Sequence, residues 1–252
     1  MDVYAVDLGT TNTKVVLYDD QLHDLAVAHA PMRYHRDGAW VEFDPDTVFE
    51  TVLALINRCA ERAGRAGHAQ IVVTGQAESL VLVDGEGRPV APGISWLDER
   101  SVKEATEIAE TFDAELAFAT TGAPAPTPTW PATKLRWLQR HRPELLRAAR
   151  RVLMLKDYVL LRLTGVAVGE ETTRGFTYLY DVPSRKYWTE MLDFCGTPPE
   201  AMPELVPAGA DIGPVLAEVA DRLPSAASYT VNVGALDHFC AMVGTGSYKP
   251  GR

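Results

Sequence analysis

Cysteine is scarce in this sequence of 252 residues: there are three, and they lie far apart, at positions 59, 195 and 240. Their odd number and wide spacing do not suit a disulfide framework or a zinc knuckle, so reduced thiols are expected. The six histidines show no metal-ligand spacing either. No apolar run approaches the roughly 20 residues of a membrane span, and acidic residues interrupt the N-terminal segment where a secretory leader would need an apolar core. These absences predict a cytoplasmic protein without a membrane partner.

Long basic runs are missing as well. The formal net charge of −10 disfavours nonspecific binding to nucleic acid or to an anionic membrane. A composition of 46% hydrophobic and 23% charged residues argues against disorder and supports a large core. We therefore expect one large α/β domain or two small ones, with no nucleic-acid partner.

The most informative motif is DLGTTNTK at residues 7–14, which lies between two short apolar runs. Two strands joined by a glycine and small polar residues can form a hairpin that grips phosphate. Gly9 permits a positive φ and a close approach of the backbone to a ligand, and threonine hydroxyls lie beside exposed N–H groups. Asp7, at the end of the first strand, can hold a hydrated Mg²⁺ that bridges phosphate oxygens. An ordinary hairpin turn explains the motif about equally well. The candidate phosphate ligands are Gly9, Thr10, Thr11, Asn12, Thr13 and Lys14.

Asp237 is the candidate catalytic residue. It follows an apolar strand at residues 229–233 and a turn, and it begins a helix that residues 244–246 close. Ligands collect at such strand-to-helix turns in open α/β sheets. Position alone favours a helix cap. Combined with a phosphate hairpin, a general base for a substrate hydroxyl becomes the better interpretation, because phosphoryl transfer needs mainly positioning, metal and proton acceptance.

Two polar segments, TGQAES at residues 74–79 and ISWLDER at residues 94–100, are candidates for a sugar pocket. Sugars bind convergent hydrogen-bonding groups together with an aromatic or apolar wall. The candidate sugar ligands are Gln76, Glu78, Trp96, Asp98, Arg100, Trp130 and Asp237. Alternatively, Trp96 belongs to the core, Asp98 and Arg100 form a weak surface ion pair, and Trp130 packs within a proline-rich loop.

The remaining pattern predicts alternating strands and helices. Asp44 is a natural N-cap, and Pro45 suits the first helical position. The first elements follow the order β-β-β-α-β, with a polar stretch at residues 36–38 before the helix. The expected strands are residues 3–6, 15–18, 23–29, 71–74, 80–83 and 229–233. The expected helices are residues 45–64, 99–112, 132–141, 144–150 and 158–165, with an irregular loop at 122–131.

The order of these motifs resembles the FGGY family of carbohydrate kinases over essentially the whole chain. The resemblance rests on the following segments: DLGTTNTK at 7–14, GQ at 75–76, WLDER at 96–100, TG at 121–122, KLRWL at 134–138, KDY at 156–158, LTG at 163–165, YDV at 180–182, Trp188, GALD at 234–237 and GTG at 244–246.

This resemblance implies a ribonuclease H-like (actin-like ATPase) α/β domain with a mixed central sheet and flanking helices. It implies that Asp7 associates with the metal, that Thr10 and Thr11 contact phosphate, and that Asp237 deprotonates the accepting hydroxyl. ATP and Mg²⁺ are the implied cofactors. The family folds two such domains on a hinge, so residues 1–252 would be the N-terminal, sugar-binding domain. The chain would end near the hinge, lack the C-terminal nucleotide-binding domain, and be inactive alone. A homodimer is a further option.

Residues 76–78, QAE, depart from the Gln-Met-His that is typical of xylulokinases and from the Gln-Arg-Glu that is typical of glycerol kinases. Residues 170–175, EETTRG, also depart from the usual segment rich in serine and alanine. The prediction is therefore a sugar or polyol kinase domain, xylulokinase-like or related. A noncatalytic sugar-binding or regulatory module is the alternative. Another actin-fold protein, such as an acetate kinase or a chaperone ATPase, fits residues 75–76 and 96–100 less well.

Overall fold

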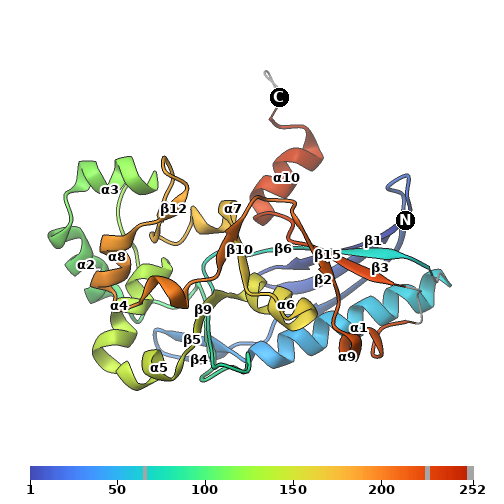
Figure 1. The fold of residues 1–252 in the computed structure, drawn as a ribbon, viewed down its shortest axis with the longest axis horizontal. Helices are drawn as coiled ribbons and strands as arrows, with labels where there is room; N and C mark the ends of the chain where they lie inside the picture. The colour runs from blue at the N-terminus through green and yellow to red at the C-terminus, as the bar shows by residue number, and fades with distance from the viewer. Residues whose placement is uncertain (65–66, 225–227, 249–252) are drawn as a thin grey trace.

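A computed structural model describes residues 1–64, 67–224 and 228–248 of the protein. Its central feature is a six-stranded mixed sheet with the strand order β14-β15-β6-β1-β2-β3 (Figure 1). Strands β1, β6 and β15 are parallel to one another, whereas β2, β3 and β14 run antiparallel to their neighbours. The bounds are Asp2–Leu8 (β1), Asn12–Tyr18 (β2), Asp24–Pro31 (β3), Ala69–Gly75 (β6), Asp211–Pro214 (β14) and Tyr229–Asn232 (β15). This arrangement confirms an α/β fold with a mixed sheet.

Helices α1 (Pro45–Ala63) and α6 (Leu155–Thr164) pack side by side against one face of this sheet (Figure 1). Helix α1 begins as predicted, because Asp44 accepts a hydrogen bond from Asp46 N at 3.0 Å, and it ends at Gly64 with φ 60°. The core between the sheet and the helices consists of alternate strand residues, such as Val6, and one stripe of α1, such as Ile56.

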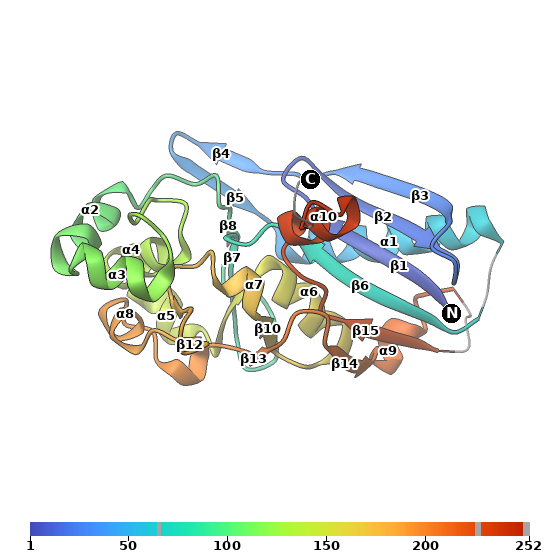
Figure 2. The ribbon, with the colours of Figure 1, turned by 90° about the horizontal axis from the view of Figure 1, so that it is seen from above.

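A five-stranded antiparallel sheet with the order β4-β5-β8-β7-β9 lies beside the first one. Its strands are His35–Asp37 (β4), Trp40–Phe43 (β5), Leu80–Val83 (β7), Gly93–Ile94 (β8) and Arg151–Met154 (β9). Further helices surround a second core next to it, at the end of the molecule away from the six-stranded sheet (Figure 2). They are Val102–Thr111 (α2), Ala114–Thr121 (α3), Pro131–His141 (α4), Pro143–Ala148 (α5) and Thr189–Phe194 (α8).

The remaining elements are short, except for α10, which projects from the other side of the six-stranded sheet (Figure 1). They are Val168–Glu170 (β10), Glu171–Arg174 (α7), Tyr180–Asp181 (β11), Lys186–Tyr187 (β12), the 3₁₀ helix Pro199–Ala201, Glu204–Val206 (β13), Ala217–Ala220 (α9) and Asp237–Thr245 (α10). In the part of the chain that is described, no helix is both long and apolar enough to cross a membrane.

The predicted order β-β-β-α-β is wrong, because the β4–β5 hairpin lies between β3 and α1. All three residues of β4 are exposed, so the strand has no apolar alternation to reveal it, and only its pairing with β5 defines it. Helix α3 was also not predicted, since its apolar residues do not gather on one side. Residues 122–130 are irregular, as predicted.

Candidate active site

The carboxyl ends of three parallel strands meet at one edge of the six-stranded sheet. Asp7 lies near the end of β1, Glu78 follows β6, and Asp237 follows β15 through a short loop. An isolated parallel bridge between Gly75 and Leu236 keeps the ends of the last two segments together. Ligands bind at this edge in open α/β sheets. The fold therefore brings the three predicted carboxylates to one place although they are far apart in the sequence.

The three carboxylates influence one another electrostatically. Burial raises the pKa of Asp7. Lys14, whose Nζ lies 3.7 Å from Asp7 Oδ2, acts to lower this pKa, and the charge of Asp237 acts to raise it further. Burial also raises the pKa of Glu78, where Lys134 acts in the opposite direction and Asp237 again adds. Like charges held together in this way favour a bound cation or a set of hydroxyl donors.

Asp7 is suited to a metal ion that is shared with a phosphate. Among the described residues, no group of three or more His, Cys, Asp and Glu side chains is placed to hold a metal ion. Mg²⁺ usually keeps several waters and takes one or two carboxylates together with substrate phosphates. The Asp7 side chain is 34% exposed, and its raised pKa reflects a site that a cation would stabilise. Asp7 therefore fits Mg²⁺ bound jointly with phosphate oxygens.

The predicted phosphate hairpin is the turn between β1 and β2. Gly9 does not have a positive φ, but a Cβ at this position would lie 2.8 Å from the carbonyl oxygen of Asn12, so the tight turn excludes a side chain. The side chains of Asn12 and Lys14 are exposed, whereas Thr13 is buried in the opposite face of β2. Because side chains alternate along a strand, the hydroxyl of Thr13 does not reach the face predicted to contact phosphate.

Thr10 connects this hairpin to the predicted sugar pocket. Trp96 Nε1 donates to Thr10 Oγ1 at 2.9 Å, and the backbone N–H of Trp96 donates to Ser79 Oγ at 3.1 Å. Ser79 donates to Gln76 Oε1 at 2.7 Å. The side chain of Gln76 lies near the hydroxyl of Tyr34. Burial raises the pKa of Tyr34, and Gln76 acts in the opposite direction. The buried Nε2 of Gln76 has no hydrogen-bond partner among the described residues. Gln76 thus leaves one buried donor for a ligand.

Asp98 and Arg100 form a buried ion pair. The two oxygens of Asp98 accept hydrogen bonds from Val41 N and from N, Nε and Nη2 of Arg100, at 2.6 to 3.0 Å. Arg100 also reaches Glu42 at 2.8 Å and stacks over Trp40 at 4.2 Å. Asp98 was predicted to contact a sugar directly. Its four hydrogen bonds within the protein occupy every lone pair of the carboxylate, so none remains for a sugar hydroxyl. The weak surface pair is also wrong, since the two side chains are 0% and 3% exposed.

The proline-rich loop is held by a buried lysine that the sequence analysis did not assign to the site. Lys134 Nζ donates to the carbonyl oxygens of Pro128 and Thr129, both at 2.7 Å. The next residue of the loop, Trp130, stacks on Phe176 with ring centroids 6.1 Å apart and an interplanar angle of 14°. Trp130 therefore lines a neighbouring cavity, and no hydrogen bond joins it to Gln76 or Glu78 among the described residues.

The loop from β15 to α10 crosses closely over β6. Gly234 has a φ of 60°, and a Cβ there would overlap the carbonyl oxygen of Val73. Thr74 Oγ1 donates to the carbonyl oxygen of Ala235 at 2.7 Å. Glycine is required here both for its left-handed backbone and for the close approach. This contact fixes the path of the chain into Asp237.

Asp237 is the first residue of α10, and Leu236 occupies the N-cap position. Asp237 Oδ1 accepts a hydrogen bond from His238 N at 2.6 Å and lies 2.7 Å from His238 Nδ1. The side chain is 35% exposed, and its Oδ2 has no hydrogen-bond partner in the described segments. Asp237 thus does not serve as the N-cap, and one carboxylate oxygen remains open to a ligand.

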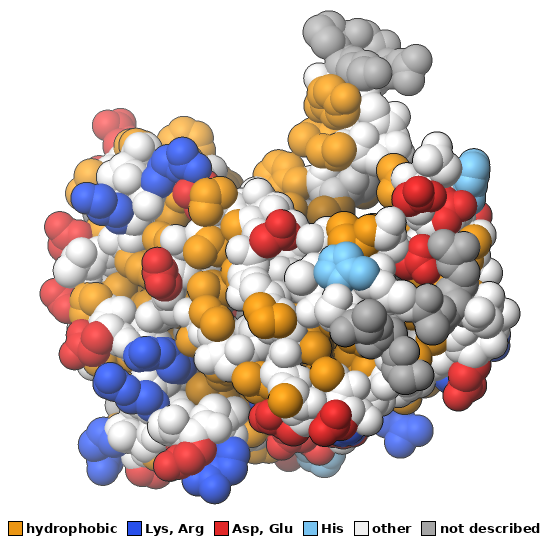
Figure 3. Space-filling model, turned by 45° about the vertical axis from the view of Figure 1, so that its right-hand side comes forward, with side chains coloured by type: hydrophobic (Ala, Val, Ile, Leu, Met, Phe, Trp, Pro, Cys, Tyr) orange, Lys and Arg blue, Asp and Glu red, His pale blue; other side chains and the backbone are white. Residues whose placement is uncertain are grey.

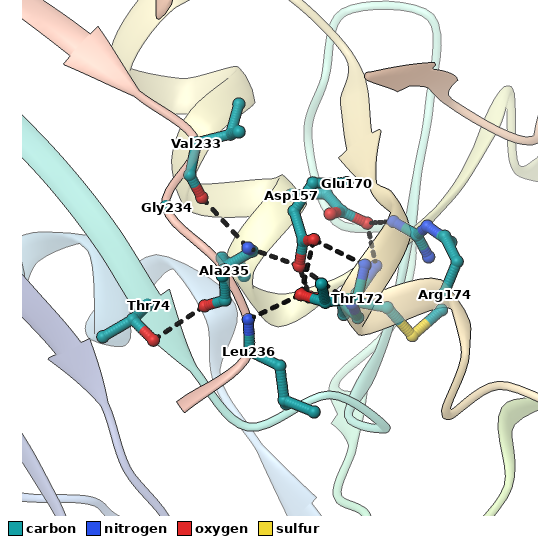
Figure 4. A network of polar contacts seen from close by, with 12 residues as sticks. Thr74, Asp157, Glu170, Thr172, Arg174, Val233, Gly234, Ala235 and Leu236 are labelled. Carbon is teal, nitrogen blue, oxygen red and sulfur yellow. Dashed lines mark hydrogen bonds and ion pairs between the residues drawn. The ribbon is translucent and has the colours of Figure 1, made fainter. Parts of the chain in front are cut away.

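A buried polar network supports the same loop (Figure 4). Lys156 Nζ donates to Glu170 Oε1 at 2.8 Å and to the carbonyl oxygen of Val233 at 3.0 Å. Thr172 Oγ1 donates to Glu170 Oε2 at 2.6 Å and accepts a hydrogen bond from Leu236 N at 2.9 Å. Burial alone would raise the pKa of Glu170, but Lys156 and the hydroxyl donors lower it overall. Leu236, the residue before Asp237, is therefore linked through Thr172 to the ionised, fully buried carboxylate of Glu170.

A second buried ion pair, between Arg174 and Asp157, adjoins this network. Asp157 also accepts a hydrogen bond from Met154 N at 2.8 Å. The absence of a Cβ at Gly169 leaves room for the guanidinium group. Neither charge was predicted from the sequence to have a role. The departure of residues 170–175 from the family pattern was a sign that this segment is unusual. The sequence alone could not show which residues pair with its charges.

The chain is similar to known proteins over nearly its whole length. Residues 3–244 match the family model described as the FGGY family of carbohydrate kinases, N-terminal domain. The chain is 29% identical over 249 residues to xylulose kinase from Streptomyces rubiginosus, covering 99% of this chain and 51% of that protein. It is 27% identical over 259 residues to glycerol kinase from Rhizobium meliloti (strain 1021), again covering 99% and 51%. The chain thus spans about half the length of these curated relatives.

Similarity to a solved structure extends over the entire fold. The crystal structure of xylulose kinase from Rhodospirillum rubrum superposes with a TM-score of 0.90 at 29% identity, covering 100% of this chain and 52% of that chain. This similarity, together with the mixed central sheet, confirms the predicted ribonuclease H-like (actin-like ATPase) fold.

The first prediction concerns the Arg174–Asp157 pair. Arg174→Met would leave the Asp157 carboxylate buried without its cation, so the free energy of unfolding should fall by about 3 to 5 kcal/mol. Adding Asp157→Asn should recover much of this loss, because no uncompensated charge would remain. Denaturant unfolding of the single and double variants measures both effects. Arg222→Met, which breaks the exposed pair with Glu50, is the control and should cost less than about 1 kcal/mol. Equal costs for Arg174→Met and Arg222→Met would contradict the prediction.

The second prediction concerns pH. Burial lowers the pKa of Lys134 to about 7, with Asp98 and Glu78 acting in the opposite direction. In the unfolded chain this lysine binds a proton below about pH 10, so between about pH 7 and pH 10 the unfolded state holds more protons. The free energy of unfolding should therefore rise with pH over this range in the wild type relative to Lys134→Met.

Denaturant unfolding at several pH values between 7 and 9.5 would measure the two slopes. Lys103→Met, which removes an exposed lysine from α2, is the control and should leave the wild-type slope unchanged. If the free energy of unfolding depends on pH in the same way in the wild type and in Lys134→Met, the idea that buried Lys134 is neutral above about pH 7 is wrong.

Proposed function

The chain belongs to the FGGY family of carbohydrate kinases, and we propose that it is the sugar-binding N-terminal domain of an ATP-dependent sugar or polyol kinase. The observation that carries this proposal is the convergence of Asp7, Glu78 and Asp237 at the carboxyl ends of three parallel strands. Each carboxylate comes from a different part of the chain, and each has a different chemical neighbourhood. The arrangement suits a reaction that joins a hydroxyl, a metal ion and phosphate.

Asp237 accepts the proton of the reacting hydroxyl in this proposal. Its Oδ1 accepts a hydrogen bond from His238 N, whereas its Oδ2 has no hydrogen-bond partner among the described residues. Its charge acts on both Asp7 and Glu78. A positioned carboxylate can act as a general base for phosphoryl transfer. Mg²⁺ bound with Asp7 would neutralise charge on the phosphate groups of ATP. The backbone and hydroxyl groups of Thr10 and Thr11 would orient those groups, with Thr10 held by Trp96.

Glu78 and Gln76 bind the acceptor. The carboxylate of Glu78 can accept hydrogen bonds from adjacent hydroxyls, and the unpartnered Nε2 of Gln76 can donate one. Ala77, between them, is buried and small, so no long cationic side chain occupies this part of the pocket. A four- to six-carbon sugar or sugar alcohol therefore fits better than glycerol.

The second half of the kinase is the proposed partner. Helix α10 has no buried residue among its nine, although it carries the exposed apolar side chains of Phe239, Met242 and Val243. Figure 3 shows this helix projecting from the surface with hydrophobic side chains along it. Because the chain spans about half the length of its relatives, a C-terminal nucleotide-binding domain is the natural cover for this helix. Residues 249–252, where the hinge is expected, lie outside the described residues.

Chemistry would then require closure of the two domains, which brings ATP in line with the hydroxyl. A match to about half the length of the relatives also suits a noncatalytic sugar-binding module, which would keep the pocket without turning over ATP. Activity in the presence of the C-terminal half distinguishes these two functions, because only the kinase would consume ATP when sugar is added.

The third prediction tests the role of Asp237. In the protein that includes the C-terminal half, Asp237→Asn should lower kcat by about 10²- to 10⁴-fold, with little change in the KM for the sugar. Steady-state rates at saturating ATP, measured by ADP release, give both constants. Asp20→Asn, at an exposed turn, is the matched control and should retain wild-type rates. Near-normal turnover of Asp237→Asn would remove the base from the mechanism.

The fourth prediction tests the sugar pocket with the chain itself. Glu78→Ala should weaken binding of the preferred sugar by about 1 to 3 kcal/mol, and Glu78→Gln should cost less, since the amide oxygen still accepts hydrogen bonds. Calorimetric titration with glycerol, erythritol, xylitol and xylulose would provide the affinities. Glu110→Ala, on the exposed side of α2, serves as the control. Tightest binding of glycerol, or unchanged binding by Glu78→Ala, would rule out this pocket.

A further inference from the structure

A cavity of about 630 Å³ lies beside α10, and the proposed reaction assigns it no ligand. Trp130, Phe176 and Phe239 line it together, and we call it the aromatic cavity. Trp130 stacks on Phe176, and Phe176 meets Phe239 edge-on, with ring centroids 6.4 Å apart. Residues 121–124, at the end of α3 and just after it, also line the cavity. Figure 3 shows the surface hollowed next to the projecting helix.

The aromatic cavity adjoins the proposed reaction centre. Phe239 is two residues after Asp237 in α10, and Thr172, which also lines the cavity, accepts a hydrogen bond from Leu236 N at 2.9 Å. Asp237 does not itself line the cavity, because residues two apart in a helix point in different directions. The backbone on either side of Asp237 nevertheless contacts or carries residues that do. A molecule whose hydroxyl lies at Asp237 can extend its other end into this space.

The polar side chains around the aromatic cavity are already engaged. Glu171 pairs with Arg185. Thr172 Oγ1 donates to Glu170, and Thr121 Oγ1 donates to a backbone carbonyl within α3 at 2.8 Å. A group rich in hydroxyls would find few free partners here, and it would lose its hydrogen bonds to water. The cavity is therefore suited to an apolar group.

The aromatic side chains are also costly to leave in water. Phe176 is 36% exposed and Phe239 is 37% exposed, and they share one wall. Clustered exposed apolar surface of this kind marks a binding site more often than scattered single residues do. The volume falls within the range of about 300 to 1,000 Å³ that small-molecule pockets occupy. Flat rings at this spacing can stack on another flat apolar group.

We propose that the aromatic cavity holds an apolar substituent of the phosphoryl acceptor, so that the substrate is an aryl or alkyl ether or glycoside of a small polyol or sugar. This inference rests on the proposed function, because it places the reacting hydroxyl at Asp237. The polar end of such a molecule meets Gln76 and Glu78, and its apolar end lies against Phe176 and Phe239. The substituent would thus determine specificity without taking part in the chemistry.

The fifth prediction compares matched ligand pairs by calorimetric titration of the chain: glycerol against its monophenyl ether, and xylitol against its monophenyl ether. Burial of the added ring should make the ether bind about 10- to 100-fold more tightly than the parent polyol. Phe176→Ala and Phe239→Ala should each reduce this ratio several-fold. Phe118→Ala, which removes an exposed phenylalanine of α3 outside the cavity, should leave the ratio unchanged.

The outcomes separate this inference from the proposed function. If the polyols bind in a Glu78-dependent manner but the ethers bind no more tightly, the inference is wrong and the proposed function stands. If neither polyols nor ethers bind, the proposed function fails and the inference with it. An ether preference that survives both Phe→Ala changes also overturns the inference. The inference is also overturned if the protein with the C-terminal half shows no higher kcat/KM for the ethers than for the polyols. In that case the C-terminal half would fill the cavity.

Discussion

The position of every candidate group depends on the parallel alignment of β1, β6 and β15. Their carboxyl ends share one edge, so Asp7, Glu78 and Asp237 converge although 230 positions separate the first from the last. The approach of Gly234 to β6 keeps the third strand in register with the other two at this edge. The same proximity places like charges together: burial raises the pKa of Asp7 and of Glu78, and the charge of Asp237 adds a smaller increase to each. In the proposed function, a cation and a hydroxyl donor would complete this site.

Buried ion pairs fix the loops that extend from this edge. Asp98 and Arg100 hold the segment that carries Trp96, and the Glu170 network holds the segment that carries Asp237. Buried charges of this kind contribute little net stability compared with apolar packing, but breaking one partner is costly. Their value here is geometric, because a carboxylate that accepts several hydrogen bonds defines the positions of all its donors. Catalytic groups on loops need such support.

Local sequence patterns were sufficient for many of the elements and for the residue types of the site. The DLGTTNTK segment predicted a hairpin, Asp44 with Pro45 predicted the start of α1, and the GALD segment predicted a turn into α10. These features depend on contacts between residues close in the chain, such as a cap or a tight turn, so composition and spacing reveal them. Strand β4 was not predicted, because its exposed residues show no apolar alternation and only its pairing with β5 forms it.

The sequence by itself determined the family, the α/β class and the presence of the three carboxylates. Only the tertiary structure decided which polar residues are paired or buried and which remain free for a ligand. Spacing could not show that Asp98 and Arg100 satisfy each other, that Thr13 lies on the inner face of β2, or that Lys134 holds the proline-rich loop. It also could not bring Trp130, Phe176 and Phe239 to one wall. The reason is physical: burial and pairing arise from contacts between distant segments, and a one-dimensional pattern records the groups but not their partners.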